Sequence, residues 1–189
     1  MTSMARTYFE EMYAHSDDPW DFAHSEYELR KYALTVASLP RVRYANAFEP
    51  GCSVGVLSEL LAARCLRLLA SDMMGAPLVV AASRLESLDN VHLEERTIPD
   101  DWPDELFDLV VLSEVAYYFD VETLTRISEL VISSTVAGAH VVGVHWRGRT
   151  NYPLSGDAAH AVIDQSSKLA LIVHHVEDDF VLDVWERLA

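Results

Sequence analysis

The residues best suited to chemistry stand in one short stretch, Glu49-Pro-Gly-Cys-Ser-Val-Gly55. An apolar run precedes this stretch and a helical pattern follows it, so the order is strand, glycine-rich turn, helix. Because glycine has no Cβ atom, Gly51 and Gly55 let the backbone turn tightly and let a ligand lie against it. The new helix points free N–H groups to the same place. The sequence therefore predicts a ligand site at this turn.

A second acid, Asp72, closes the next apolar run. An acid about 20 residues past such a turn, on the neighbouring strand, can accept hydrogen bonds from ribose hydroxyls. Glu49 would repel the pyrophosphate of a dinucleotide, but it suits the ammonium of S-adenosylmethionine, which carries no phosphate. The pattern resembles the first motif of class I methyltransferases, with Ser53 in place of the middle of three alternating glycines. We predict S-adenosylmethionine as cofactor and S-adenosylhomocysteine as product.

Composition limits the class of protein. The 189 residues, half of them hydrophobic, favour one domain with an ample core. No stretch approaches the roughly 20 apolar residues of a membrane span, and the first residues do not read as a secretory signal. Two cysteines form neither a disulfide framework nor a metal site, which favours a cytoplasmic chain without a metal. The formal charge of −16 argues against nucleic acid and membrane partners and permits a neutral or cationic small molecule, with the oligomeric state left open.

Alternating patterns predict the elements that must position these residues. Strand-like runs fall at 44–48, 66–71, 91–94, 107–112 and 139–145, and helical patterns at 4–14, 25–39, 55–64, 76–86 and 121–134. The tail, 169–176 and 179–186, is typical of an antiparallel hairpin. We predict a Rossmann-like α/β fold, with a mostly parallel seven-stranded sheet and helices on both faces. Residues 1–40 would form a helical cap over the cofactor site, and 41–189 the core of the single domain.

Open parallel sheets bind ligands beyond the carboxyl ends of their strands, so the residues directly after each strand are candidates. Met73 follows Asp72. Thr97 and Ile98 follow the third strand, where backbone amides could contact adenine and Ile98 could form an apolar wall. Ser113 ends the fourth strand. We assign these residues to the predicted cofactor site.

Two ionisable groups could act on a methyl acceptor. Glu114 follows the fourth strand, where its carboxylate could face the methionine end of the cofactor or a substrate amine. Equally, Glu114 could be an acid favoured by a helix N-terminus. His145 ends the fifth strand and could be a general base, unless neighbouring groups satisfy it. We predict both as catalytic, with His145 as the base and Glu114 holding the amine.

The predicted acceptor site draws on the ends of the last two parallel strands and on a later loop. Its members are Tyr117, Tyr118, Trp146, Arg147, Asp157 and His160. The two tyrosines could stack on a sugar or only pack in the core. The aspartate and the histidine could form a second acid–base pair, or belong to a surface turn and a helix cap.

The N-terminal segment could close the site. Trp20 stands among aspartates and a proline, where an aromatic side chain is expected to cover something. Arg30 lies on the following helix, and its planar guanidinium could hold the methionine carboxylate through two hydrogen bonds. The alternatives are that Trp20 packs this helix on the sheet and that Arg30 pairs with Glu26.

A series of motifs together resembles one family, nodulation protein S and its relatives. They are Asp18-Pro-Trp-Asp-Phe22, Tyr27-Glu-Leu-Arg-Lys-Tyr32, Glu49 to Gly55, Asp100-Asp-Trp-Pro103, Leu112-Ser-Glu-Val115, His145-Trp-Arg147, Tyr152-Pro-Leu-Ser-Gly-Asp157 and His175-Val-Glu-Asp-Asp-Phe180. The resemblance implies N-methylation of a small-molecule amine. Since the family's nodulation member methylates a deacetylated chitooligosaccharide, it also implies an amino sugar or oligosaccharide acceptor. The alternatives are a non-catalytic cofactor-binding scaffold and an O-methyltransferase.

Overall fold

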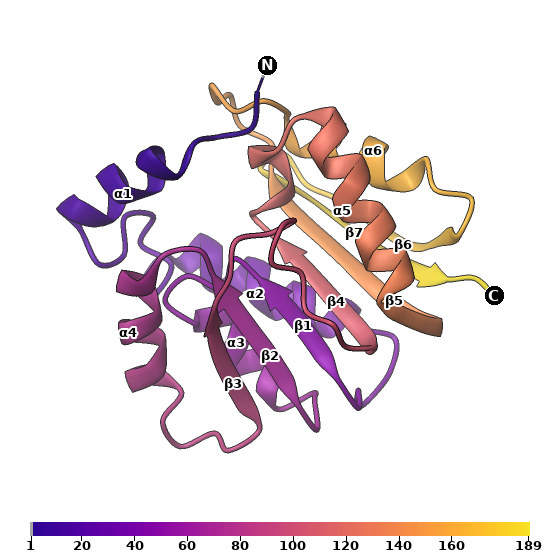
Figure 1. The fold of residues 1–189 in the computed structure, drawn as a ribbon, viewed down its shortest axis with the longest axis horizontal. Coiled ribbons are helices and arrows are strands. Elements are labelled where there is room, and N and C mark those ends of the chain that lie inside the picture. The colour runs from indigo at the N-terminus through magenta and orange to yellow at the C-terminus, as the bar shows by residue number, and fades with distance from the viewer. Residues whose placement is uncertain (1) are drawn as a thin grey trace.

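The described chain, residues 2–189 of a computed structural model, is built around one seven-stranded sheet of order β3-β2-β1-β4-β5-β7-β6 (Figure 1). Its strands are β1 (Ala47–Pro50), β2 (Leu68–Asp72), β3 (Val91–Glu95), β4 (Phe107–Ser113), β5 (Thr135–Trp146), β6 (Leu169–Val176) and β7 (Phe180–Arg187). Strands β1 to β5 run parallel, whereas β7 runs antiparallel to both β5 and β6. The predicted mostly parallel sheet with a C-terminal hairpin is confirmed.

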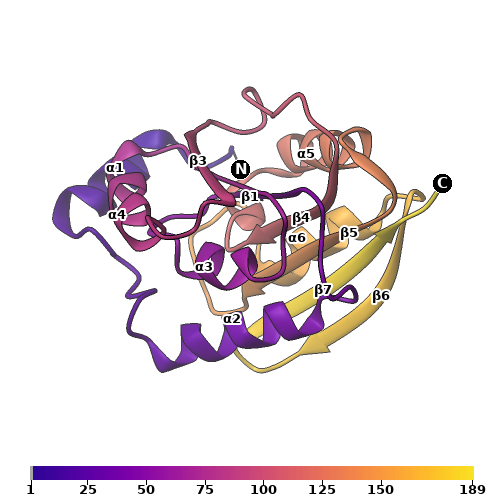
Figure 2. The same ribbon diagram turned by 90° about the horizontal axis from the view of Figure 1, so that it is seen from below.

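Helices cover both faces of this sheet, as predicted. The described helices are α1 (Arg6–His15), α2 (Glu26–Ser38), α3 (Val56–Ala62), α4 (Gly75–Arg84), α5 (Val121–Ser133) and α6 (Gly156–Asp164), with the 3-10 turn η1 (Ala116–Tyr118). Figure 2 shows α2 and α5 on opposite sides of the sheet. Of the two interpretations of Asp157 and His160, the helix cap holds, because Ser155 accepts a hydrogen bond from Ala158 N at 3.2 Å and begins α6.

Alternate residues of the central strands serve two separate apolar cores. In β4, Leu109 and Val111 pack with α2 and α3, whereas Val110 and Leu112 pack with α5 and α6. This alternation follows from the two-residue period of a strand whose faces are both covered. The sheet is therefore a rigid middle layer, and the loops at its carboxyl edge are held from both sides.

The first forty residues fall into two parts. Ser25 caps α2 by accepting a hydrogen bond from Glu28 N at 3.4 Å, and α2 buries Tyr32 and Thr35 against the sheet. Helix α1, in contrast, buries none of its residues. It lies at the carboxyl edge of the sheet, so the segment before α2 is placed to cover a site there (Figure 1).

Candidate functional site

A cavity of about 430 Å³ lies at the carboxyl ends of β1, β2 and β4, with side chains of α1 in its wall. Most of the predicted cofactor residues line it, namely Trp20, Glu49, Gly51, Ser53, Asp72, Met73, Thr97, Ile98 and Ser113. Glu114 and Tyr118 line it as well. The structure thus brings together residues that span almost a hundred positions of the sequence, because the parallel strands all end at the same edge.

The two glycines of the turn after β1 act differently. Gly51 has φ +76°, and a Cβ there would lie 3.2 Å from the Val115 side chain in the cavity wall. Gly55 has φ +77°, and its Cβ would lie 3.1 Å from Ala81 and from Leu85. Gly51 therefore keeps the cavity open. Gly55, predicted to bind the cofactor, does not line the cavity and instead lets α3 and α4 approach each other.

Two buried carboxylates face this cavity. Asp72 accepts hydrogen bonds from Ser53 N at 3.0 Å and from Met74 N at 2.9 Å, and burial raises its pKa to about 6. Glu49 accepts a hydrogen bond from Ser58 Oγ at 2.6 Å, and burial raises its pKa to about 7. The remaining lone pairs of both carboxyl groups can accept hydrogen bonds from a ligand. Because burial disfavours their charged forms, an ammonium donor would stabilise those forms.

One further polar atom supports a ligand with hydrogen-bonding groups. Ser71 lines the cavity, and its buried hydroxyl has no hydrogen-bond partner among the described residues. A buried hydroxyl without a partner costs stability, and a polar ligand group that reached Ser71 would remove this cost. Apolar side chains of Met73, Ile98 and Val115 complete a lining that suits a nucleoside with a polar sugar and a flat base.

Aromatic residues before α2 cover the cavity. Tyr13 shares a hydrogen bond with Ser53 Oγ at 2.7 Å, and Trp20 lies edge-on to Tyr13 with ring centroids 5.6 Å apart. Trp20 also stacks on Phe22 at 5.5 Å. Tyr13, Trp20 and Phe22 all line the cavity. Of the two interpretations of Trp20, the structure therefore favours the one in which it covers the site. Tyr13 and Phe22 were not among the predicted residues.

Arg30 lies outside the cavity. Its guanidinium donates two hydrogen bonds to Glu177, at 2.6 and 2.8 Å. Arg30 is on the solvent-exposed side of α2, where the turn between β6 and β7 reaches it. The structure therefore contradicts its predicted contact with the methionine carboxylate, and the alternative pairing with Glu26 is wrong too.

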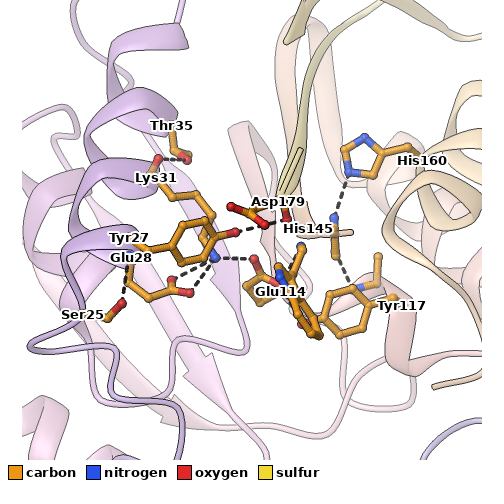
Figure 3. A network of polar contacts seen from close by, with 12 residues as sticks. Ser25, Tyr27, Glu28, Lys31, Thr35, Glu114, Tyr117, His145, His160 and Asp179 are labelled. Carbon is orange, nitrogen blue, oxygen red and sulfur yellow. Dashed lines mark hydrogen bonds and ion pairs between the residues drawn. The ribbon is translucent and has the colours of Figure 1, made fainter. Parts of the chain in front are cut away.

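The neighbouring Lys31 is a site residue that sequence reasoning missed. It is fully buried, and its Nζ donates to Glu28 at 2.9 Å and to Glu114 Oε1 (Figure 3). One residue along a helix turns the side chain by about 100°, which carries Lys31 to the face that packs on the sheet. The available signal was the Glu28–Lys31 spacing beside Tyr32 and Thr35, which form the buried side of α2.

Three donors hold the carboxylate of Glu114. Lys31 bonds Oε1, while the Tyr117 hydroxyl at 2.6 Å and Trp146 N at 3.1 Å bond Oε2 (Figure 3). Glu114 also adopts φ +53°, a left-handed conformation that is rare outside glycine. A carboxylate has about four acceptor positions, so about one is left for a donor in the cavity.

The remaining predicted acceptor residues lie outside the cavity. Tyr117 is buried and stacks on Tyr152, with centroids 5.0 Å apart, so its packing interpretation holds. Only the backbone of Trp146 reaches Glu114. Arg147 pairs with Asp157 at 3.0 Å, which leaves no Asp157–His160 pair. That predicted acid–base pair is wrong, because α6 points the aspartate outward and the histidine inward.

His145 does not face the cavity either. It is fully buried, its Nε2 accepts a hydrogen bond from Ala116 N at 2.9 Å, and its Nδ1 lies 2.9 Å from His160 Nε2. Burial lowers the pKa of His145 well below its usual value. With both ring nitrogens engaged, His145 cannot take a proton from a ligand in the cavity. The prediction of a base is contradicted, and the alternative of a histidine satisfied by its neighbours holds.

Within residues 2–189, the group with metal-ligand spacing is Asp18, Asp21 and His24, on the exposed loop before α2. The Asp18 oxygens already accept hydrogen bonds from Phe22 N at 3.0 Å and from Ala23 N at 2.9 Å. These hydrogen bonds stabilise the turns between α1 and α2. No described helix is long and apolar enough to cross a membrane.

Comparison with known proteins identifies relatives over most of this chain. A family model described as nodulation protein S (NodS) matches residues 7–143. Nodulation protein S of Rhizobium tropici is 29% identical over 129 residues, which cover 67% of this chain and 54% of that protein. The homologue of Bradyrhizobium diazoefficiens is 36% identical over 105 residues, covering 54% and 49%. The chain spans about half the length of the curated relatives that it matches.

Solved structures share the fold. A Pseudomonas syringae protein, described provisionally as a methyltransferase, is 36% identical with a TM-score of 0.77, and the match covers 86% of this chain and all of that one. The N-methyltransferase NodS of Bradyrhizobium japonicum WM9, in complex with S-adenosyl-L-homocysteine, is 22% identical with a TM-score of 0.82, covering 96% and 97%. The second likeness establishes the fold alone.

Proposed function

Because this chain belongs to the nodulation protein S family and has the fold of its methyltransferases, we propose that it is an S-adenosylmethionine-dependent methyltransferase that acts on the amine of a small molecule. The observation that carries the proposal is the pair of buried carboxylates, Glu49 and Asp72, in a cavity kept open by Gly51. When bound, the cofactor would supply a methyl group activated on a sulfonium, so transfer requires mainly positioning and exclusion of water.

The chain's own residues divide these tasks. Asp72 would accept hydrogen bonds from the ribose hydroxyls, and Glu49 would accept them from the ammonium of the methionine part. Trp20 and Tyr13 would exclude water from above. Glu114, with about one acceptor position left, would hold the acceptor nitrogen by one N–H and orient its lone pair toward the methyl group.

The charge of the cavity supports an amine. Its three arginines are all paired with acids outside the predicted cofactor contacts: Arg6 with Glu95, Arg96 with Glu94, and Arg126 with Asp100. The carboxylates of Glu49 and Asp72 are therefore not matched by cations in the lining, whereas Glu114 is already paired with Lys31. Such a cavity favours a neutral or cationic acceptor over a carboxylate or a phosphate.

An amino sugar or oligosaccharide is the acceptor class that we propose within this activity, on the strength of the family. Transfer to an oxygen and cofactor binding without catalysis are the competing outcomes. We also propose a cytoplasmic location, a small-molecule partner, and no nucleic-acid partner, because the formal charge is −16 and both cysteines are free and buried.

Calorimetry with S-adenosylhomocysteine tests the cofactor. The wild type should bind, and Asp72→Ala should weaken binding by about 1–3 kcal/mol, because charged hydrogen bonds to two hydroxyls are lost. Asp89→Ala, which removes an exposed acid, is the matched control and should bind normally. No binding by the wild type, or equal affinity in Asp72→Ala, would exclude this assignment.

Methyl transfer from labelled cofactor tests the acceptor. A deacetylated chitooligosaccharide and its N-acetylated form are a matched pair that differ in a free amine. Transfer to the deacetylated form alone supports N-methylation. Transfer to both forms indicates an oxygen acceptor, and cofactor binding without transfer to a panel of amines and alcohols indicates a scaffold.

A further inference from the structure

A second group of buried polar side chains lies behind the Glu114 loop, on the face of the sheet covered by α6. His145 of β5, His160 of α6 and Asp183 of β7 are 0%, 4% and 4% exposed, and none of them lines the cavity. Gly143 makes room for them, because a Cβ there would lie 3.1 Å from the His160 ring. Buried ionisable groups outside a ligand site need another explanation.

The hydrogen bonds that connect Ala116, His145, His160 and Asp183 have one possible direction. Ala116 N–H can only donate, so His145 Nε2, 2.9 Å away, carries a lone pair, and the proton of this neutral ring is on Nδ1. His145 Nδ1–H therefore donates to His160 Nε2 at 2.9 Å. The proton of His160 must then be on Nδ1, which donates to Asp183 Oδ2 at 2.7 Å.

Asp183 closes the chain as an acceptor. Its Oδ1 lies 2.6 Å from Nδ1 of the half-exposed His174, at the outer strand β6. Burial alone would raise the pKa of Asp183, but the hydrogen bonds from His160 and His174 outweigh it and lower that pKa. The carboxylate at one end and the backbone N–H at the other leave the two rings no alternative tautomer.

These hydrogen bonds hold the backbone beside Glu114. Ala116 begins the turn η1, two residues after Glu114 and two before Tyr118 of the cavity wall. Glu114 is in a left-handed conformation, which persists only where the surroundings fix it. The His145 ring supplies one such fixed point on the side away from the cavity.

We propose that Asp183 and His160 are positioning residues: they fix the tautomer of His145, which holds Ala116 N–H and thereby orients the Glu114 carboxylate toward the methyl acceptor. The link to the acceptor rests on the proposed function, whereas the tautomers do not. Without the Asp183 acceptor, the Nδ1–H of His160 loses its partner. A His160 proton on Nε2 would point at His145 Nδ1 and move the His145 proton to Nε2, against Ala116 N–H.

Nitrogen NMR of histidine-labelled protein tests the tautomers without any ligand. The wild type should show His145 and His160 as neutral Nδ1–H tautomers. Asp183→Asn retains a carbonyl acceptor and should preserve them, whereas Asp183→Ala should abolish the Nδ1–H form of His160. His174→Ala, which removes only the exposed end, is the control and should leave both signals unchanged.

Three NMR results would overturn the proposal, including one that needs no variant to fold. These are an Nε2–H or charged His145 in the wild type, unchanged tautomers in Asp183→Ala, and altered tautomers in His174→Ala.

Once an acceptor is known, Asp183→Ala should lower kcat by about 10–100-fold, since small misplacements at a site have effects of this size. Affinity for S-adenosylhomocysteine should change less, and Asp183→Asn should rescue kcat. A kcat that stays normal despite altered tautomers would also overturn the proposal. An absence of transfer by the wild type would instead contradict the proposed function.

Discussion

Two polar networks hold the loop that follows β4, from Glu114 to Tyr118, from opposite faces of the sheet. They differ in the kind of interaction that they make with it. On the α2 face, Lys31 bridges the carboxylates of Glu28 and Glu114 as a buried ion group. On the α6 face, His145 and His160 form a neutral chain that binds the loop backbone through Ala116 N. One network contacts the side chain by charge, and the other contacts the main chain by hydrogen bonds.

The difference indicates what each network can specify. An ammonium is a compact charge that attracts a carboxylate from many directions, so Lys31 attracts Glu114 strongly but orients it weakly. A neutral imidazole accepts a hydrogen bond only along its ring plane at one nitrogen, so His145 fixes the direction of the backbone. The loop needs both, because a ligand contact depends on the charge and on the angle of the same carboxylate.

Lys31→Met should have the largest effect on the charged network. The substitution keeps the apolar length of the side chain but leaves Glu28 and Glu114 buried without their cation. Breaking a buried ion pair in this way costs about 3–5 kcal/mol of unfolding free energy. Urea denaturation measures it, with Lys168→Met, at the exposed second lysine of the chain, as the matched control.

The double variant Lys31→Met with Glu28→Gln sharpens this test. If buried charge is the cause, removing one of the two carboxylates should restore part of the lost stability. A loss in Lys31→Met no larger than that in Lys168→Met would mean that the ion group contributes little and that the comparison with the neutral network fails.

The two networks should respond to pH with opposite signs. Burial raises the pKa of Glu28, so its contribution to stability is full below the usual value of about 4.3 and is lost as pH rises. Burial lowers the pKa of His145, so its contribution is full above about 6.5 and is lost as pH falls. Wild-type stability relative to Glu28→Gln should therefore fall with rising pH, and relative to His145→Gln with falling pH. Melting temperatures across a pH series measure both, and slopes of the same sign would contradict this assignment.

Tyr117→Phe should have the smallest effect. It removes the 2.6 Å hydrogen bond to Glu114 Oε2 but leaves Lys31 and Trp146 N in place. We expect a loss of about 1 kcal/mol in unfolding free energy, because the ring still packs. Tyr152→Phe, which removes a hydroxyl bonded to Tyr8 rather than to a carboxylate, is the comparison. A loss as large as that of Lys31→Met would show that the Tyr117 hydroxyl contributes as much as the lysine and would contradict this ranking.

The cofactor side of the cavity could be predicted from the sequence because its signal is local. Glu49, Gly51 and Ser53 belong to one turn, and Asp72 ends the very next strand. Strand, turn and helix patterns fix where such residues point, since side chains alternate along a strand and a parallel sheet ends all its strands at one edge.

Apart from Glu114 and Tyr118, the acceptor side could not be predicted, because its geometry depends on packing between distant elements. Arg30 and Lys31 are adjacent and both basic, yet the orientation of α2 on the sheet sends one to Glu177 and the other to Glu114. His160 is three residues from Asp157 but bonds Asp183, on β7. Adjacency in sequence was a poor guide here, since only the placement of α2, α6 and β7 decides these pairs.

Helix α1 has a consequence for the kinetics of ligand exchange. It buries no residue, although Phe9 and Tyr13 line the cavity. A helix with so few buried contacts opens at a small fraction of the free energy needed to unfold the protein. A ligand would give these aromatic side chains a surface to pack on, so part of the intrinsic binding energy is used to order α1. Residence time would then follow the opening rate of one helix, and substitutions that loosen α1 would speed arrival and departure together.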